Sequence, residues 1–248
     1  MKKTLIIIIA VLLLGVGYLV LFKQTPPTPQ KNETKIQEGS MEEKFTIPKK
    51  SAHYESNTPA HGVILAAVPL NVVIDFNFDL VKPSSITIDK DSKDYGVGET
   101  VIDKNKLTMR RTMNPDSPEG RYTVLYRACW PDKTCHDGNF QFEIDKRKSK
   151  TYEDQRGKNE VTVKLADIAF KPKNLLISRG TKITWINDDG VEHYINTDSH
   201  PAHTYYLSQN SEALNQDGSY SLAFNTPGIY PYHCSAHADS MSGSIIVE

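Results

Sequence analysis

The chain has 248 residues, which is enough for two domains of ordinary size. Its formal net charge is −1, and the one marked basic run, Lys146–Lys148, reads as a solvated linker, so nothing favours nucleic acid as a partner. Hydrophobic residues make up 38% of the chain, which is sufficient for packed cores and excludes a wholly disordered protein.

The first 22 residues differ in kind from the rest. Lys2 and Lys3 precede an uncharged run, Thr4–Phe22, whose length as a helix is about 28 Å, close to the hydrocarbon thickness of a bilayer. The leading lysines favour a cytoplasmic N-terminus and a single-pass anchor, with the remainder in the periplasm or extracellular space. A cleaved signal peptide is the alternative, and Gly15–Gly17 only weakly resembles its cleavage signal.

Composition divides the exported part into four segments. Residues 23–45 are rich in Pro, Gln, Lys and Glu and are expected to form a flexible linker. A first domain is expected over residues 46–145, a second linker over 146–159 and a second domain over 160–248. The sequence thus predicts two domains outside the membrane.

Both domains show the short, β-rich runs and the Pro and Gly punctuation of an all-β protein. In the first domain the expected strands are 72–78, 85–88, 122–126 and 140–144, and in the second they are 161–165, 175–178, 182–187, 221–224, 229–232 and 244–247. The predicted fold class is therefore all-β, with two β-sandwich domains behind an N-terminal transmembrane helix.

The predicted export affects how the three cysteines are interpreted, because thiols outside the cytoplasm tend to pair. Cys129 and Cys135 are close enough in sequence to form a small bridge across a loop. Cys234 is then left over, and metal ligation is one explanation for an odd cysteine in an exported protein.

The segment from Cys234 to Met241 places a thiol, the imidazole of His237 and a thioether within eight residues. A fourth ligand must come from outside this loop, and His193, in the segment 191–195, is well placed to supply it. Two imidazoles, one thiolate and a weak axial thioether form the trigonal site of an electron-transfer copper. Zinc is the chemical alternative, but a thioether ligand argues against it.

Further residues of the second domain resemble the cupredoxins, particularly the plastocyanin and amicyanin branch. The similarity lies in 168–172, in 180–188 with Trp185, in 225–234 leading into Cys234, and in 241–247. It implies a Greek-key sandwich with one type 1 copper held by the same four ligands, and a one-electron carrier whose redox partner proteins remain unknown. The segment 200–216 does not align with the family.

Ligand counting separates this site from other copper proteins. A dinuclear centre needs two cysteines in the loop, and the sequence has only Cys234 there. Multicopper oxidases and copper nitrite reductases need additional histidine-rich sites, and no His-x-His pair is present. We therefore expect a carrier and not an enzyme. His200 and His203 could share an ion but lack an evident third ligand, and His233 should point away from the copper.

The first domain resembles the CopC-type copper-resistance domain, an Ig-like sandwich, in Pro59–Gly62 and in Gly138–Phe142. The family's two histidine positions fall on Ser51 and Thr134, and His53 and His136 are each displaced by two residues. Such a displacement keeps a strand residue on the same face, so one interpretation is that both histidines converge with Asp132 on a second copper. The alternative is that both histidines are structural and that Asp132 faces solvent.

Three functions are consistent with these features. The first is electron transfer by a membrane-anchored copper protein, and the second is copper homeostasis, by storage or delivery. In the third, the first domain is only a spacer or docking module for the cupredoxin-like domain.

Overall fold

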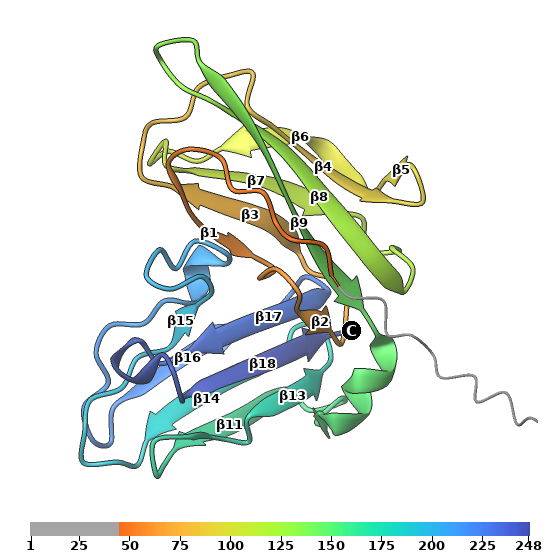
Figure 1. Cartoon of the computed structure of the whole chain (residues 1–248). Helices are drawn as coiled ribbons and strands as arrows, with labels where there is room; N and C mark the ends of the chain where they lie inside the picture. Colours follow the sequence, from red (N-terminus) through yellow and green to blue (C-terminus); the bar gives the residue numbers. More distant parts are fainter. Residues whose placement is uncertain (1–44) are drawn as a thin grey trace, which may run out of the picture. The chain divides into compact units, whose positions relative to one another are not determined.

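A computed structural model describes residues 45–248, and in this part strands alternate with loops and three short 3₁₀ turns. The first domain consists of two facing sheets, orange to green in Figure 1. One sheet has the order β1 (Tyr54–Thr58), β3 (Asn71–Phe76), β7 (Thr108–Met113) and β6 (Gly96–Ile102), and the other has the order β2 (Ile64–Leu65), β9 (Cys135–Ile144), β8 (Gly120–Cys129), β4 (Ser85–Lys90) and β5 (Lys93–Asp94).

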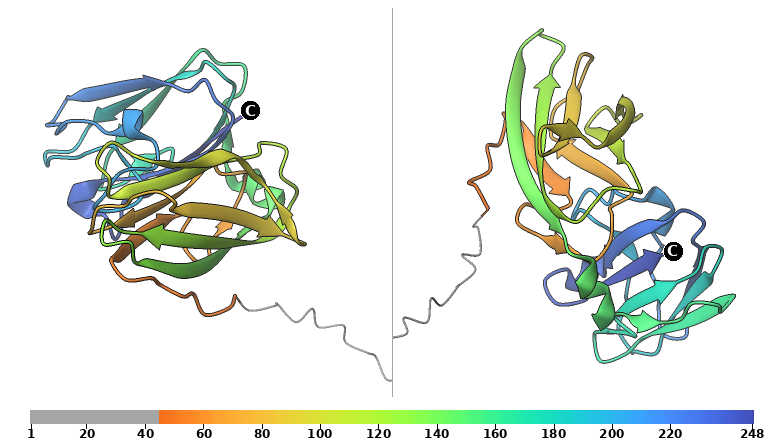
Figure 2. Two further views of the ribbon diagram at one scale, coloured as in Figure 1. Left: turned by 90° about the horizontal axis from the view of Figure 1, so that it is seen from above. Right: turned by 90° about the vertical axis from the view of Figure 1, so that its right-hand side faces the viewer.

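The second domain also consists of two sheets, cyan to blue in the two views of Figure 2. One has the order β12 (Phe170–Lys171), β11 (Glu160–Leu165), β14 (Lys182–Asn187) and β16 (Ser219–Ala223), and the other has the order β10 (Glu153–Asp154), β13 (Asn174–Ile177), β18 (Ser242–Val247), β17 (Gly228–His233) and β15 (Asn196–Thr197). The all-β prediction is confirmed.

Alternation along the strands determines which side chains enter each core. On β8, Tyr122, Val124 and Tyr126 are buried between the two sheets of the first sandwich. On β14, Ile183 and Trp185 are buried in the second. Each strand thus leaves its intervening residues to the outer face.

Three strands of the second sandwich are buried on both faces. On β18, Ile245 packs in the second core, whereas Ile246 joins the core of the first sandwich, as do Leu176 of β13 and Ile229 of β17. The two sandwiches therefore share apolar packing, and residues 45–248 behave as one compact unit.

The segment 146–159, predicted as a linker, has structure of its own. It forms the turn η1 (Lys146–Thr151), which begins where the Asp145 carboxylate accepts a hydrogen bond from the N–H of Arg147. Strand β10 then pairs in parallel with β13 and extends a sheet of the second sandwich. The segment therefore adds a strand to that sandwich.

Cys129 and Cys135 face each other across the hairpin of β8 and β9 and are joined by a disulfide. Cys234 is a free, buried thiol. The predicted anchor over residues 1–22 lies outside the described residues, as does nearly all of the linker 23–45. Within residues 45–248, no helix is long and apolar enough to cross a membrane.

Candidate metal centre

The end of β17 and the turn that follows carry the thiol and one imidazole of the site. The turn η3 (Ser235–His237) closes when the N–H of His237 donates to the carbonyl oxygen of Cys234 at 2.9 Å. The backbone N–H of Cys234 donates to Met241 at 2.9 Å, and the N–H of Met241 donates to His237 at 2.9 Å. These bonds fold the loop into a small closed turn that holds all three residues together.

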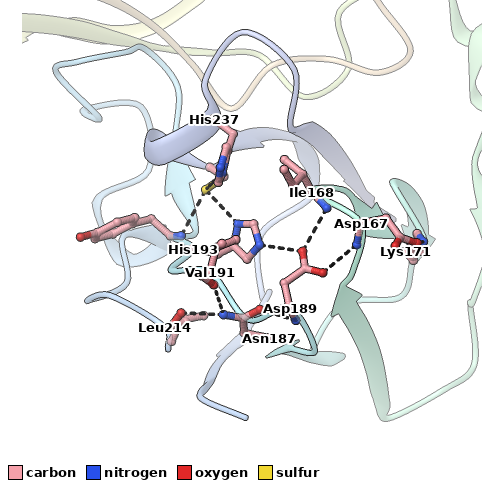
Figure 3. A network of polar contacts seen from close by, with 11 residues as sticks. Asp167, Ile168, Lys171, Asn187, Asp189, Val191, His193, Leu214 and His237 are labelled. Carbon is pink, nitrogen blue, oxygen red and sulfur yellow. Dashed lines mark hydrogen bonds and ion pairs between the residues drawn. The ribbon is translucent and has the colours of Figure 1, made fainter. Parts of the chain in front are cut away.

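His193 reaches the same place from a different part of the chain. Its backbone pairs with that of Leu214 in a two-way bridge, with N–O distances of 3.1 and 2.8 Å. Its side chain is fully buried, and Nδ1 lies 3.5 Å from Cys234 Sγ, while Nδ1 of His237 lies 3.6 Å from the same sulfur. Figure 3 shows both imidazoles directed at the sulfur.

A carboxylate determines the orientation of the His193 ring. Asp189 Oδ2 lies 2.9 Å from His193 Nε2. Because an ionised carboxylate only accepts hydrogen bonds, Nε2 carries the proton and the lone pair of Nδ1 is free for a metal. The Asp189 carboxylate also accepts from the N–H groups of Asp167 at 2.8 Å and Ile168 at 3.0 Å (Figure 3).

The backbone that serves Asp189 is held in an uncommon conformation. Asp167 and Ile168 are consecutive left-handed residues, with φ of 55° and 54°, which is unusual for a β-branched side chain. The hydrogen bond from the Ile168 N–H is the largest cause that lowers the pKa of Asp189, and the bond to His193 adds to it. Asp189 is therefore kept as an anion that fixes the ligand ring.

The remaining neighbours of the sulfur are a backbone amide and the core. The N–H of Tyr194 donates to Cys234 Sγ at 3.3 Å. Asn187 steadies the loop that carries His193, because its amide donates to the carbonyl oxygens of Val191 and Leu214, both at 2.8 Å. Met241 is buried in the same core cluster as Cys234.

The donor set fits copper. A buried thiol that receives one N–H bond lies between two imidazole nitrogens, and the thioether of Met241 belongs to the surrounding core. Soft sulfur suits Cu(I), and imidazole suits both oxidation states. His193, Cys234 and His237 would bind the ion, while Asp189 and the Tyr194 N–H would orient and tune two of these ligands.

Comparisons with known proteins also indicate a copper-binding protein. The profile for copper binding proteins of the plastocyanin/azurin family matches residues 157–248, and the CopC domain profile matches residues 54–145. Plastocyanin of Scenedesmus fuscus is 36% identical over an alignment of 101 residues that covers 36% of this chain and 100% of that protein. Amicyanin-alpha of Methylorubrum extorquens is 32% identical over 88 residues, 35% of this chain and 70% of that protein.

Among solved structures, a copper(I) form of an amicyanin variant covers 36% of this chain and 83% of its own, with 25% identity and a TM-score of 0.32. Fold and site together define a copper-binding β-sandwich of the cupredoxin class. Through residues 157–248 the chain belongs to the plastocyanin/azurin family of copper-binding proteins, and it carries a CopC domain ahead of it.

The residues proposed for a site in the CopC domain are arranged differently. His53 Nδ1 lies 3.0 Å from Asn77 Oδ1, and the rings of His53 and His136 each lie 5.3 Å from that of Trp130. The Asp132 carboxylate accepts hydrogen bonds from Thr134, which lower its pKa. Within residues 45–248, two groups of three side chains are close enough to share a metal ion, and His53, Asp132 and His136 belong to neither of them. A copper site there stays a prediction.

A second cluster that the sequence analysis did not assemble contains His200, His203 and His233. His233 precedes Cys234 and points to the opposite face of the strand, as alternation predicts. The structure therefore places a third imidazole, that of His233, beside those of His200 and His203. Its sequence position gives no sign of this, because the loop 198–206 brings the other two to it.

Replacing Asp189 with asparagine is expected to raise the reduction potential of bound copper. An amide supports less electron density on the His193 ring than a carboxylate does, so Cu(II) is stabilised less. A 10- to 100-fold decrease in the affinity of the site for Cu(II) relative to Cu(I) corresponds to about 60–120 mV for one electron. Protein voltammetry measures the shift.

Asp188→Asn is the matched control, since Asp188 pairs with Lys164 at 2.7 Å on the exposed surface. It is expected to leave the potential within about 10 mV, because a solvated pair contributes little. Equal shifts in both variants would show that Asp189 acts only through net charge.

Proposed function

We propose that this protein is an extracytoplasmic blue copper protein that transfers single electrons and is held at the cell membrane by residues 1–22. The observation that supports it best is the convergence of Cys234, His193 and His237, with the two imidazole nitrogens 3.5 and 3.6 Å from the sulfur. Copper bound there would supply the chemistry, by alternating between Cu(II) and Cu(I).

The residues around the ion favour fast transfer because they restrict its movement. Asp189, the Tyr194 N–H and the closed turn after Cys234 each fix one ligand by a hydrogen bond. Ligands that are already positioned need little rearrangement when the charge changes. Met241 is proposed as the weak axial ligand.

An edge of the site is open to a redox partner. His193 and Cys234 are fully buried, whereas His237 is only partly buried. Two apolar side chains near the site, Ile168 and Val191, are exposed at 45% and 48%. Exposed apolar side chains near an electron-transfer ligand suit brief docking of a partner protein.

Direct electrochemistry of the copper-loaded protein tests this function. We expect a reversible couple with one electron per chain and with equal oxidative and reductive currents. An irreversible wave, or loss of the metal on reduction, would contradict the carrier role and favour the second candidate.

The second candidate is copper handling, by storage or delivery, and the CopC domain over residues 54–145 is the feature that favours it. It predicts that copper leaves readily for a chelating acceptor within minutes. Retention of copper in the presence of a competing chelator would favour the carrier.

A further inference from the structure

Three imidazoles converge on the opposite side of β17 from Cys234. His203 Nε2 lies 3.2 Å from His233 Nε2, and the nitrogen atoms that His200, His203 and His233 offer lie within 4.8 Å of one another. The three ring centroids are 5.1–5.4 Å apart. Three neutral imidazoles at this spacing are a common ligand set for a divalent transition metal.

The rings are held in place by their surroundings. Asp198 Oδ1 lies 3.2 Å from Nδ1 of His233, which leaves Nε2 of that ring directed at the cluster. Asn210 donates to the carbonyl oxygen of His203 at 2.9 Å, and Ser235 Oγ lies 3.1 Å from His203 Nε2. A carboxylate behind a metal-binding imidazole is the arrangement that fixes its orientation.

The CopC domain braces the loop that carries two of the histidines. Ser199 and Thr204, on either side of His200 and His203, both donate to the buried Asp75 of β3, at 2.7 and 2.8 Å. Arg110 of β7 donates to the carbonyl oxygens of Thr204 at 2.9 Å and Tyr205 at 3.3 Å. The positions of His200 and His203 thus depend on contacts with both sandwiches.

We propose that His200, His203 and His233 bind a second copper ion as Cu(II). Imidazole sites bind Cu(II) more tightly than other divalent first-row metals. His200 is exposed and His203 partly so, which gives an ion a route of entry and leaves a coordination position to solvent. The inference does not depend on the electron-transfer role of the first site.

The second site is joined to the first by the chain itself. His233 ends β17 and Cys234 follows it directly, and their side chains belong to different clusters, as alternation along an extended chain predicts. A single peptide unit therefore links a ligand of one copper to a ligand of the other. The two ions would differ in spectrum, because only the first has a thiolate ligand.

Without a metal, the 3.2 Å contact is explained as a hydrogen bond between one protonated and one unprotonated Nε2 of His203 and His233. That explanation assigns no role to the exposed His200, whose ring lies 5.3 Å from His233 and 5.4 Å from His203. A metal titration distinguishes the two explanations, because only the metal-site proposal expects a second ion to bind.

The test is a Cu(II) titration of the metal-free full-length protein, followed by metal analysis and spin resonance. We expect two copper ions per chain, one with the narrow hyperfine splitting of a thiolate site and one with the wider splitting of an imidazole site. In His200→Ala and in the double variant His200→Ala/His203→Ala, the wide signal and one copper are expected to be lost. The thiolate absorption is expected to persist in both, which shows that the domain is folded.

A variant of the two histidines proposed for a site in the CopC domain serves as the control. His53→Ala/His136→Ala is expected to keep both ions, whereas loss of the second ion in that variant would place it in the CopC domain and overturn the proposal. A wild-type protein that binds one ion, or a His200→Ala/His203→Ala variant that still binds two, would also overturn it. Cys234→Ser is expected to keep the wide signal, so failure of the first site is distinguishable from failure of the second.

Discussion

Cys234→Ser is expected to abolish the intense visible absorption of the copper-loaded protein. The absorption comes from charge transfer between a thiolate and Cu(II), and Cys234 is the free thiol in the described chain. A serine hydroxyl is a harder and far more weakly acidic ligand, so the remaining donors are His193, His237 and the weak thioether of Met241. Optical titration with Cu(II) measures the loss, which is expected to be complete.

The metal-free variant separates loss of a ligand from loss of the fold. A hydroxyl buried among apolar side chains costs about 1–3 kcal/mol, so the apo variant is expected to unfold at a moderately lower denaturant concentration. Retention of the absorption in a folded Cys234→Ser protein would contradict thiolate ligation.

Asp75→Ala is expected to lower the free energy of unfolding by about 3–5 kcal/mol. The buried carboxylate accepts hydrogen bonds from four hydroxyl groups, those of Ser56, Thr108, Ser199 and Thr204, at 2.7–2.9 Å. Removing it leaves several buried donors without an acceptor, each at a cost of about 1–3 kcal/mol. Denaturant unfolding of the apo protein measures the change.

The control for this variant is Asp137→Ala, whose ion pair with Arg127 is exposed on both sides. It is expected to change stability by less than about 1 kcal/mol. Because Ser199 and Thr204 flank His200 and His203, Asp75→Ala is also expected to weaken the imidazole site more than the thiolate site. Equal effects of the two aspartate variants on stability would contradict the role given to Asp75.

The sequence was most informative where a site is built from neighbouring residues. Cys234, His237 and Met241 share one loop, so their spacing alone indicates a metal site. Alternation along the strand was enough to place His233 on the opposite face from Cys234. His193 lies far from this loop in sequence and was proposed because a fourth ligand must come from elsewhere, and the resemblance to cupredoxins supported it.

Features that depend on distant contacts were not predictable. Strand β7 contains Arg110 and Arg111, which interrupt its apolar pattern, and it was not expected as a strand. Arg110 pairs with Asp103 and donates to the loop of the second sandwich, while Arg111 pairs with Asp94 at 2.7 Å. Such partners are recognised only once the fold has brought them together.

The histidine cluster shows the same limit. His200 and His203 lie in a segment that does not align with the cupredoxins, and the course of that segment is set by Asp75 and Arg110. In the sequence, His200 and His203 lacked an evident third ligand, and the absence of a His-x-His pair gave no sign of a further cluster. Long-range contacts assemble that cluster in the structure.

The central claim is that one copper ion is held by a thiolate between two imidazoles. Its most direct test is the optical and spin-resonance spectrum of the protein loaded with one equivalent of Cu(II). The structure predicts an intense blue absorption together with a narrow copper hyperfine splitting, because Cys234 Sγ faces the Nδ1 atoms of His193 and His237. A protein saturated with copper that stays colourless and shows only wide hyperfine splitting would contradict it.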